Sequence, residues 1–116
     1  MKHLTLILLM TLAGCSSQPV RPVAPCLSRV SNTGSMYPHY RGGEFVAVLP
    51  VTRAELKPGM IVLTYPRWCW YPVIHRVVAL HQDCLVTRGD ANPTSDPPIT
   101  YFEIIGRVVE PTSIKP

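Results

Sequence analysis

The sequence predicts an all-β domain, and three observations support this fold class. Apolar runs rich in β-branched residues are short, and turn residues interrupt them. The 13 prolines lie mostly between these runs, as strands require, because proline cannot donate a hydrogen bond to a strand ladder. No stretch has the apolar periodicity of a long helix. A chain of 116 residues is long enough for one domain with a modest core.

Turn residues divide the chain into five expected strands. The first strand follows Gly42-Gly43 and stops at Pro50, and the second follows the turn signal Lys57-Pro58-Gly59. The third is long and β-branched, and Gln82-Asp83 can turn the chain back into the fourth. We expect strands at Phe45–Leu49, Met60–Tyr65, Val73–His81, Cys84–Thr87 and Tyr101–Val109, with one helical turn at Arg53–Leu56.

Alternation along the strands predicts which side chains face the core. Val73, His75 and Val77 share one face of their strand. A histidine on an apolar face is normally a core residue whose hydrogen bonds are satisfied. The expected core consists of Phe45, Val46, Val48, Ile61, Leu63, Ile74, Val78, Leu80, Leu85, Ile104 and Val108.

The N-terminal segment is typical of an export signal. The apolar run Leu4–Ala13 is too short to cross about 30 Å of bilayer hydrocarbon as a helix. Leu12-Ala13-Gly14-Cys15 then has the form of a bacterial lipobox, in which Cys15 is the lipid acceptor. We expect a lipoprotein signal peptide over residues 1–14, followed by a lipidated tether over residues 15–29 whose first part is rich in Ser, Gln and Pro.

The charge and the lipobox together predict where the protein acts. The net charge of +4 comes from scattered arginines and not from a basic tract, so we expect no nucleic acid partner. A mildly positive surface suits a protein that is held beside anionic lipid. We expect the protein in a bacterial cell envelope, anchored to the membrane by lipid and facing the periplasm. Ser16 after Cys15 favours the outer membrane in a Gram-negative host.

Three cysteines remain after Cys15, at positions 26, 69 and 84. In an oxidising envelope two of them can pair. A disulfide between Cys69 and Cys84 would brace the segment that contains His75, and free thiols are the alternative. No pair of cysteines or histidines has zinc-like spacing, so we expect neither a metal nor a cofactor.

Three short motifs supply the residue types of a serine hydrolase. They are Gly34-Ser35-Met36-Tyr37-Pro38, then Ile74-His75-Arg76-Val77-Val78, then Gly89-Asp90-Ala91-Asn92 followed by Asp96. A serine hydroxyl is a weak nucleophile unless a base takes its proton, and the base works best when a third group orients it. One serine, one histidine and one of two aspartates can fill these roles. A serine beside glycine, taken alone, is more often a turn residue that bonds its own backbone.

The three motifs resemble the catalytic boxes of the type I signal peptidases, in the branch that uses histidine as the base. Thr33 to Pro38 resembles the serine box, His75 to Val78 the second box, and Gly89 to Asp96 the last box, in the order of the family. The resemblance runs from about Thr33 to Val109. It implies a small coiled sheet or partial barrel like the signal peptidase catalytic core, in a serine peptidase domain over residues 30–116.

The resemblance also implies a role for each residue. Ser35 would be the nucleophile and His75 its base, because burial keeps an imidazole uncharged and able to accept a proton. The family analogy places the orienting carboxylate at Asp96, and it leaves Asp90 to support the loop. The Thr33 hydroxyl and the backbone N–H of Ser35 would stabilise the oxyanion.

The expected substrate is an exported precursor protein in an extended conformation. Such a segment would add alongside an edge strand and place alternate side chains in shallow pockets. We expect Met36 and Phe45 to contact the substrate, with the strand Phe45–Leu49 as one wall of the site. The expected function is that of a membrane-tethered endopeptidase that cleaves signal or leader segments.

The sequence also allows alternatives to this mechanism and function to be weighed. A lysine base is disfavoured, because Lys57 lies in a turn and Lys115 lies near the C-terminus, so neither occupies the second box. A catalytically inactive envelope lipoprotein that binds peptides is one other class of function. A processing peptidase dedicated to one pilin-like or conjugation partner is another. With a histidine base, activity should rise with pH across the ordinary titration range of imidazole.

Overall fold

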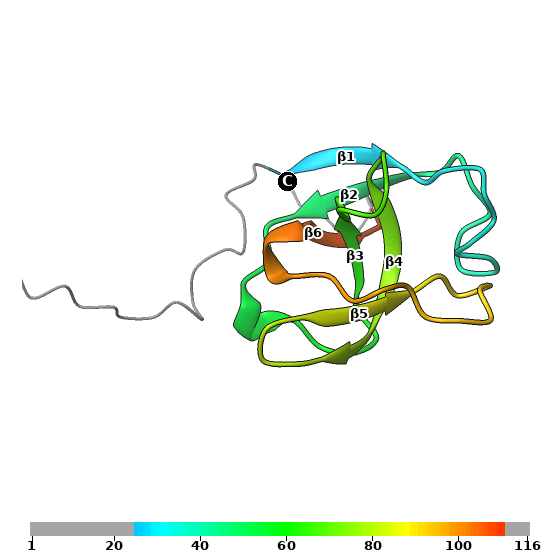
Figure 1. The fold of residues 1–116 in the computed structure, drawn as a ribbon. Coiled ribbons are helices and arrows are strands. Elements are labelled where there is room, and N and C mark those ends of the chain that lie inside the picture. Colours follow the sequence, from blue (N-terminus) through cyan, green and yellow to red (C-terminus); the bar gives the residue numbers. More distant parts are fainter. Residues whose placement is uncertain (1–24, 111–116) are drawn as a thin grey trace, which may run out of the picture.

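The computed structural model describes residues 25–110 and contains one antiparallel sheet of six strands (Figure 1). The all-β prediction is confirmed. Within the described range, the helical elements are two single 3-10 turns. In chain order the elements are β1 (Cys26–Arg29), β2 (Phe45–Leu49), η2 (Arg53–Glu55), β3 (Ile61–Thr64), β4 (Val73–Leu80), β5 (Leu85–Arg88), η3 (Tyr101–Glu103) and β6 (Ile104–Val109).

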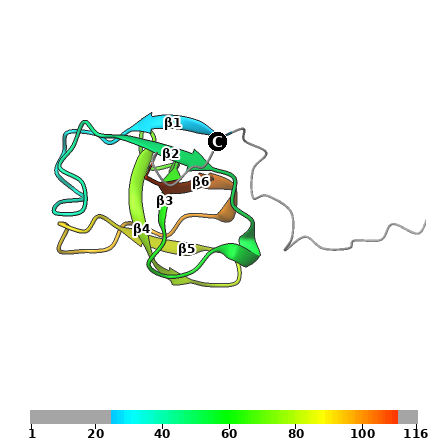
Figure 2. The ribbon, with the colours of Figure 1, turned by 180° about the vertical axis from the view of Figure 1, so that it is seen from behind.

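The strands lie in the order β1-β2-β6-β3-β4-β5, so β1 and β5 form the two edges. The sheet is curled, but these edges do not pair with each other, so it does not close into a barrel. Two opposite views place β1 and β2 at one level and β5 at another, with β4 running between them (Figures 1 and 2). The coiled sheet that we expected is present.

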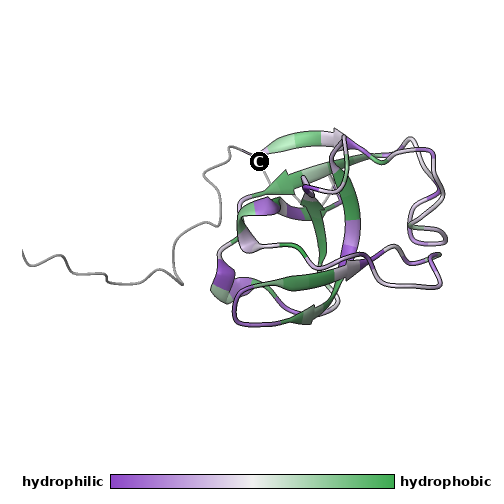
Figure 3. Cartoon of the chain, in the orientation of Figure 1, coloured by the Kyte–Doolittle hydropathy of each residue, from purple (hydrophilic) through white to green (hydrophobic). Residues whose placement is uncertain are grey.

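Strand β3 is buried on both faces, and the core forms two clusters. Along β3, Ile61 and Leu63 pack into the first cluster and Val62 packs into the second, as strand alternation requires. Figure 3 shows hydrophobic residues concentrated on the strands and hydrophilic residues on the connecting loops. The first cluster contains Val30, Met36, Tyr40, Val46, Val48, Ile61, Leu63, Ile74 and Val108, and the second contains Val51, Leu56, Val62, Val77, Leu85, Ile99 and Ile104.

The start of the fold differs from the prediction. Cys26–Arg29 forms β1 and pairs antiparallel with β2, so the last four residues of the tether predicted over 15–29 belong to the sheet. The expected signal peptide over 1–14, the lipid acceptor Cys15 and the C-terminal Lys115 lie outside the described residues. No helix between residues 25 and 110 is long and apolar enough to cross a membrane.

Three further expectations need correction. Phe45 is not a core residue, because its side chain is 55% exposed at the start of β2 and lies under the Arg29 guanidinium, 4.6 Å from the ring centroid. The strand expected from Tyr101 begins only at Ile104. The Glu103 carboxylate accepts hydrogen bonds from the N–H and hydroxyl of Thr100. Tyr101–Glu103, just before the strand, therefore form the 3-10 turn η3. Val78 and Leu80 are half-buried, next to a register shift between β4 and β5.

The contact between β2 and β6 predicts a sensitive position at Gly106. A Cβ atom there would lie 2.5 Å from the Leu49 carbonyl oxygen and 2.7 Å from a Val48 methyl group. Gly106→Ala should therefore lower the free energy of unfolding by about 1–3 kcal/mol, because the buried backbone must shift to relieve the contact. Urea denaturation measures this change. Gln82→Ala in the exposed β4–β5 turn is the control and should change stability by less than about 0.5 kcal/mol. An unchanged midpoint for Gly106→Ala would show that the two strands are not this close.

Candidate active site

Ser35 lies on the loop between β1 and β2, where a turn presents it beside a cleft. The N–H of Tyr37 donates to the Gly34 carbonyl, 3.1 Å away, and Gly34 has a φ of 76° that favours glycine. The next side chain, Met36, is only 1% exposed and packs into the first core cluster. We had expected Met36 to contact substrate. Its burial instead anchors the loop and leaves Ser35 at the surface of the cleft.

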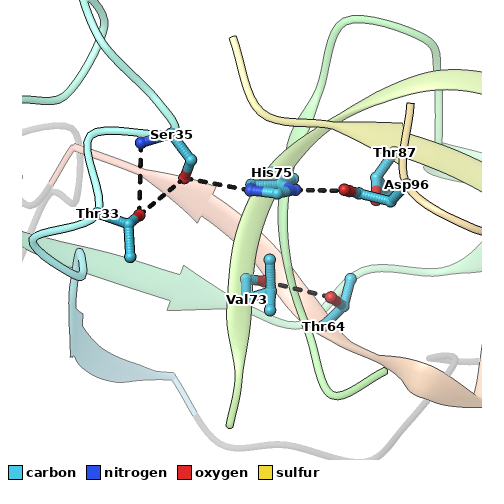
Figure 4. A network of polar contacts seen from close by, with 7 residues as sticks. All are labelled: Thr33, Ser35, Thr64, Val73, His75, Thr87 and Asp96. Carbon is cyan, nitrogen blue, oxygen red and sulfur yellow. Dashed lines mark hydrogen bonds and ion pairs between the residues drawn. The ribbon is translucent and has the colours of Figure 1, made fainter. Parts of the chain in front are cut away.

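His75 lies on β4 and joins Ser35 to Asp96 (Figure 4). Its side chain is nearly buried, because the residue is only 6% exposed. Nε2 lies 3.2 Å from Ser35 Oγ, and Nδ1 lies 2.5 Å from Asp96 Oδ2. The imidazole therefore has a hydroxyl partner on one side and a carboxylate partner on the other. With Nδ1 protonated and donating to Asp96, Nε2 is free to accept a proton from the serine.

Thr87 on β5 holds the carboxylate in place. Its hydroxyl donates to Asp96 Oδ2 at 2.8 Å, and its carbonyl accepts the backbone N–H of Asp96 at 2.8 Å. The side chain of Thr87 is buried. Thr87 was not among the residues predicted for the site. The available signal was that Thr87 lies two positions after Leu85, on the same face of the expected strand, where a buried hydroxyl requires a partner.

Gly89 permits the loop 89–96 to approach both Ser35 and His75. A Cβ atom at this position would lie 2.6 Å from the Ser35 carbonyl oxygen and 3.0 Å from His75 Nε2. The same loop is tied to the serine through the N–H of Ala91, which donates to the Ser35 carbonyl at 2.8 Å. The views in Figures 1 and 2 show the loops after β1 and after β5 at the same end of the molecule.

Asp90 is directed to a different partner. Its carboxylate forms two hydrogen bonds with the Arg76 guanidinium, at 2.8 Å to Nε and 2.7 Å to Nη2, and Arg76 also donates to the Gly59 carbonyl. The guanidinium holds the pKa of Asp90 below its ordinary value, and the carboxylate in turn raises the pKa of Arg76. Of the two aspartates that we considered, the structure therefore brings Asp96 to His75, whereas Asp90 ties the loop to β4.

Thr33 and the Ser35 backbone lie together, as the oxyanion prediction requires. The Thr33 hydroxyl lies 3.2 Å from Ser35 Oγ and 3.4 Å from the Ser35 backbone nitrogen. Ser31 Oγ lies 3.3 Å from the same Thr33 oxygen. Two donors are thus adjacent to the oxygen that would attack a carbonyl.

A cleft of about 330 Å³ opens beside these groups. Ser35, His75 and Asp96 line its polar part, together with Ser31, Thr33 and Asn92. Its other lining residues include Val30, Ile74 and several residues of the β3–β4 loop, among them Trp68 and Tyr71. Phe45 is not among the lining residues. The expected wall at Phe45–Leu49 is therefore replaced by the β3–β4 loop, because Phe45 packs under Arg29 instead.

The last points concern the cysteines, metal binding and the comparison with known proteins. Cys26, Cys69 and Cys84 are free thiols, so the disulfide considered between Cys69 and Cys84 is not formed in this structure. Among residues 25–110, no three His, Cys, Asp or Glu side chains are grouped to hold a metal ion. Comparisons with protein-family models, with curated proteins and with solved structures found no match to this chain.

The buried hydroxyl of Thr87 predicts a stability effect that can be isolated. Thr87→Val keeps the shape of the side chain and removes the donor to Asp96, so it should lower the free energy of unfolding by about 1–3 kcal/mol. Thr87→Ser retains the hydroxyl and is the matched control, which should keep the hydrogen bond. Denaturant unfolding of the three proteins measures the difference. Equal losses for valine and serine would attribute the effect to packing instead of to the hydrogen bond.

The ion pair between Arg76 and Asp90 predicts a defined pH dependence of stability. The pKa of Asp90 is lower in the folded chain than its ordinary value, so the pair stabilises the fold above about pH 4. This contribution is lost as the pH falls through the lowered pKa. Asp90→Asn should cost about 1.5–3 kcal/mol at pH 7, and the gap to the wild type should narrow in acid. Urea unfolding at a series of pH values measures this gap. A gap that is constant from neutral to acid pH would contradict the assignment.

Proposed function

We propose that this protein is a serine endopeptidase that cleaves signal or leader segments of exported precursor proteins, with Ser35 as nucleophile and His75 as general base. One observation carries the proposal. The partly accessible Ser35 Oγ lies 3.2 Å from Nε2 of the buried His75 imidazole. Nδ1 of the same ring lies 2.5 Å from the Asp96 carboxylate. The three groups come from separate parts of the chain, and nucleophilic catalysis by serine requires this order of partners.

The chemistry follows from these contacts. His75 Nε2 takes the proton of the Ser35 hydroxyl while Oγ attacks the carbonyl carbon of the scissile peptide bond. Asp96 accepts the Nδ1–H hydrogen bond and stabilises the imidazolium that forms. The imidazolium then gives its proton to the departing amine, which leaves an acyl ester on Ser35. Water attacks this ester with His75 again as the base, and the serine is regenerated.

The negative charge that develops on the carbonyl oxygen needs donors that are already in place. The Thr33 hydroxyl and the Ser35 N–H are the groups nearest to Ser35 Oγ that can serve. They bond to each other before substrate arrives, since the Ser35 N–H donates to Thr33 Oγ1. Rotation of the Thr33 side chain would free both donors for the oxyanion.

The substrate class rests on the sequence. The resemblance of the three motifs to the boxes of type I signal peptidases points to exported precursors. The lipobox at Cys15 would hold the domain at the membrane from which such precursors emerge. The cleft beside Ser35 has a volume of about 330 Å³, and an extended peptide added alongside an edge strand would place its side chains in such shallow pockets.

Substitution of the two reacting residues tests this proposal. Ser35→Ala and His75→Ala should each lower the turnover of a signal-bearing precursor by at least about a thousandfold, because the groups act as a unit. Ser28→Ala in β1 and His81→Ala in the exposed β4–β5 turn are the matched controls and should retain activity. Gel analysis or mass spectrometry of the precursor measures cleavage.

The same experiment separates the enzyme from the inactive peptide-binding lipoprotein. If the wild type and Ser35→Ala leave the precursor equally intact while both bind it, the binding module is the correct function. If both cleave it equally, neither the assignment of Ser35 nor the proposed mechanism stands.

A further inference from the structure

The loop between β3 and β4 displays four aromatic side chains to solvent. We call residues 65–72, Tyr-Pro-Arg-Trp-Cys-Trp-Tyr-Pro, the aromatic loop. Trp70 is 94% exposed, which is exceptional for a side chain of this size, and Tyr65, Trp68 and Tyr71 are exposed as well. Exposed aromatic residues that gather in one place usually mark a surface that binds a partner.

Glu103 accepts two hydrogen bonds that tie the aromatic loop to η3. Its carbonyl accepts the Tyr65 N–H and its carboxylate accepts the Arg67 N–H, both at 2.7 Å. Within the loop, the Cys69 N–H donates to the Pro66 carbonyl, and the Tyr65 hydroxyl donates to the Trp70 carbonyl. The aromatic side chains are therefore presented by a preformed turn, which reduces the entropy lost when the loop binds.

The chemistry of the loop favours one partner, the interface of a phospholipid bilayer. Tryptophan and tyrosine combine an apolar ring with a polar group, and they concentrate where headgroups meet acyl chains. Arg67 adds a positive charge, and residues 65–72 contain no acidic residue, so the loop complements anionic headgroups. We propose that the aromatic loop inserts into the membrane interface and orients the domain there.

The position of the loop fits this role. Trp68 and Tyr71 line the cleft beside Ser35, so an inserted loop would bring the cleft to the membrane surface. Ten residues separate the expected lipid acceptor Cys15 from the start of β1 at Cys26, a reach of at most about 40 Å. A tether of this length keeps the domain near the bilayer without orienting it, and the loop would supply the orientation. The inference does not require that Ser35 be active.

Tryptophan fluorescence tests the proposal directly, because the two tryptophans of the whole chain, Trp68 and Trp70, both lie in the aromatic loop. The full chain carrying Ser35→Ala is reconstituted into vesicles of zwitterionic and anionic phospholipid. Trp68→Phe leaves Trp70 as the single reporter. Its emission should shift to shorter wavelength in the vesicles, lose intensity when the acyl chains are brominated, and become less accessible to acrylamide.

A displaced tryptophan provides the matched control. Trp68→Phe and Trp70→Phe combined with His81→Trp move the reporter to the turn after β4, which is separated from the aromatic loop by the eight residues of that strand, about 26 Å. This reporter has the same tether and should remain accessible to acrylamide and unaffected by bromine. The contrast between the two reporters supports the proposal.

Four results would overturn it. Emission from Trp70 that ignores brominated lipid, or equal quenching of both reporters, would show that the loop does not face the bilayer. A shift that depends on protein concentration in the absence of lipid would indicate a second copy of the chain as the partner. A shift caused by precursor peptide in the absence of lipid would assign the loop to substrate. None of these readings depends on peptidase activity, so failure here leaves the proposed function to its own test.

Discussion

The arrangement around Ser35 depends on one constraint, which is that a nearly buried imidazole needs a polar partner at each nitrogen. Leaving such a group unpaired costs about 1–3 kcal/mol, a large share of the stability of a domain this small. Asp96 and Ser35 meet the requirement for His75. The Asp96 carboxylate needs a donor in turn, and the hydroxyl of the buried Thr87 on β5 supplies it. The folded sheet and the proposed catalytic groups are therefore coupled.

The loop 89–96 turns this pairing into a fixed geometry. Its backbone is bonded at one end to the Ser35 carbonyl through Ala91 and at the other end to the Thr87 carbonyl through Asp96. One segment thus sets the positions of both partners of the imidazole. The approach is possible because Gly89 has no side chain where a Cβ atom would meet the serine backbone. The Arg76–Asp90 pair fastens the same loop to β4, so the two aspartates contribute to one geometry through different partners.

The sequence predicted the parts of this fold that are local. The bounds of β2 follow from turn residues on both sides, and β4 from its β-branched run. The strand β1 was missed because Cys26–Arg29 is short and largely exposed, so it lacks the alternation that marks a half-buried strand. Met36 was expected to contact substrate and is buried, and Phe45 was expected in the core and is exposed, because burial at strand ends and in loops depends on which distant segments cover them. Gly89 was not singled out for the same reason, since the Ser35 carbonyl and the His75 ring that it approaches are distant in the sequence.

The direction of exposure along the polar network favours the proposed chemistry over a purely structural role. A network that only satisfies buried groups has all its members inside the protein, where solvent competes least. Here the network runs from the buried Thr87 through Asp96 and His75 to Ser35, which is half-buried and lines the cleft. Ser35, the proposed nucleophile, lies at the end that meets the cleft, and the Thr87 hydroxyl that bonds Asp96 lies at the end that meets the core. As the partner of His75 Nε2, Ser35 also satisfies the imidazole, and its place beside the cleft is what the proposed nucleophile requires.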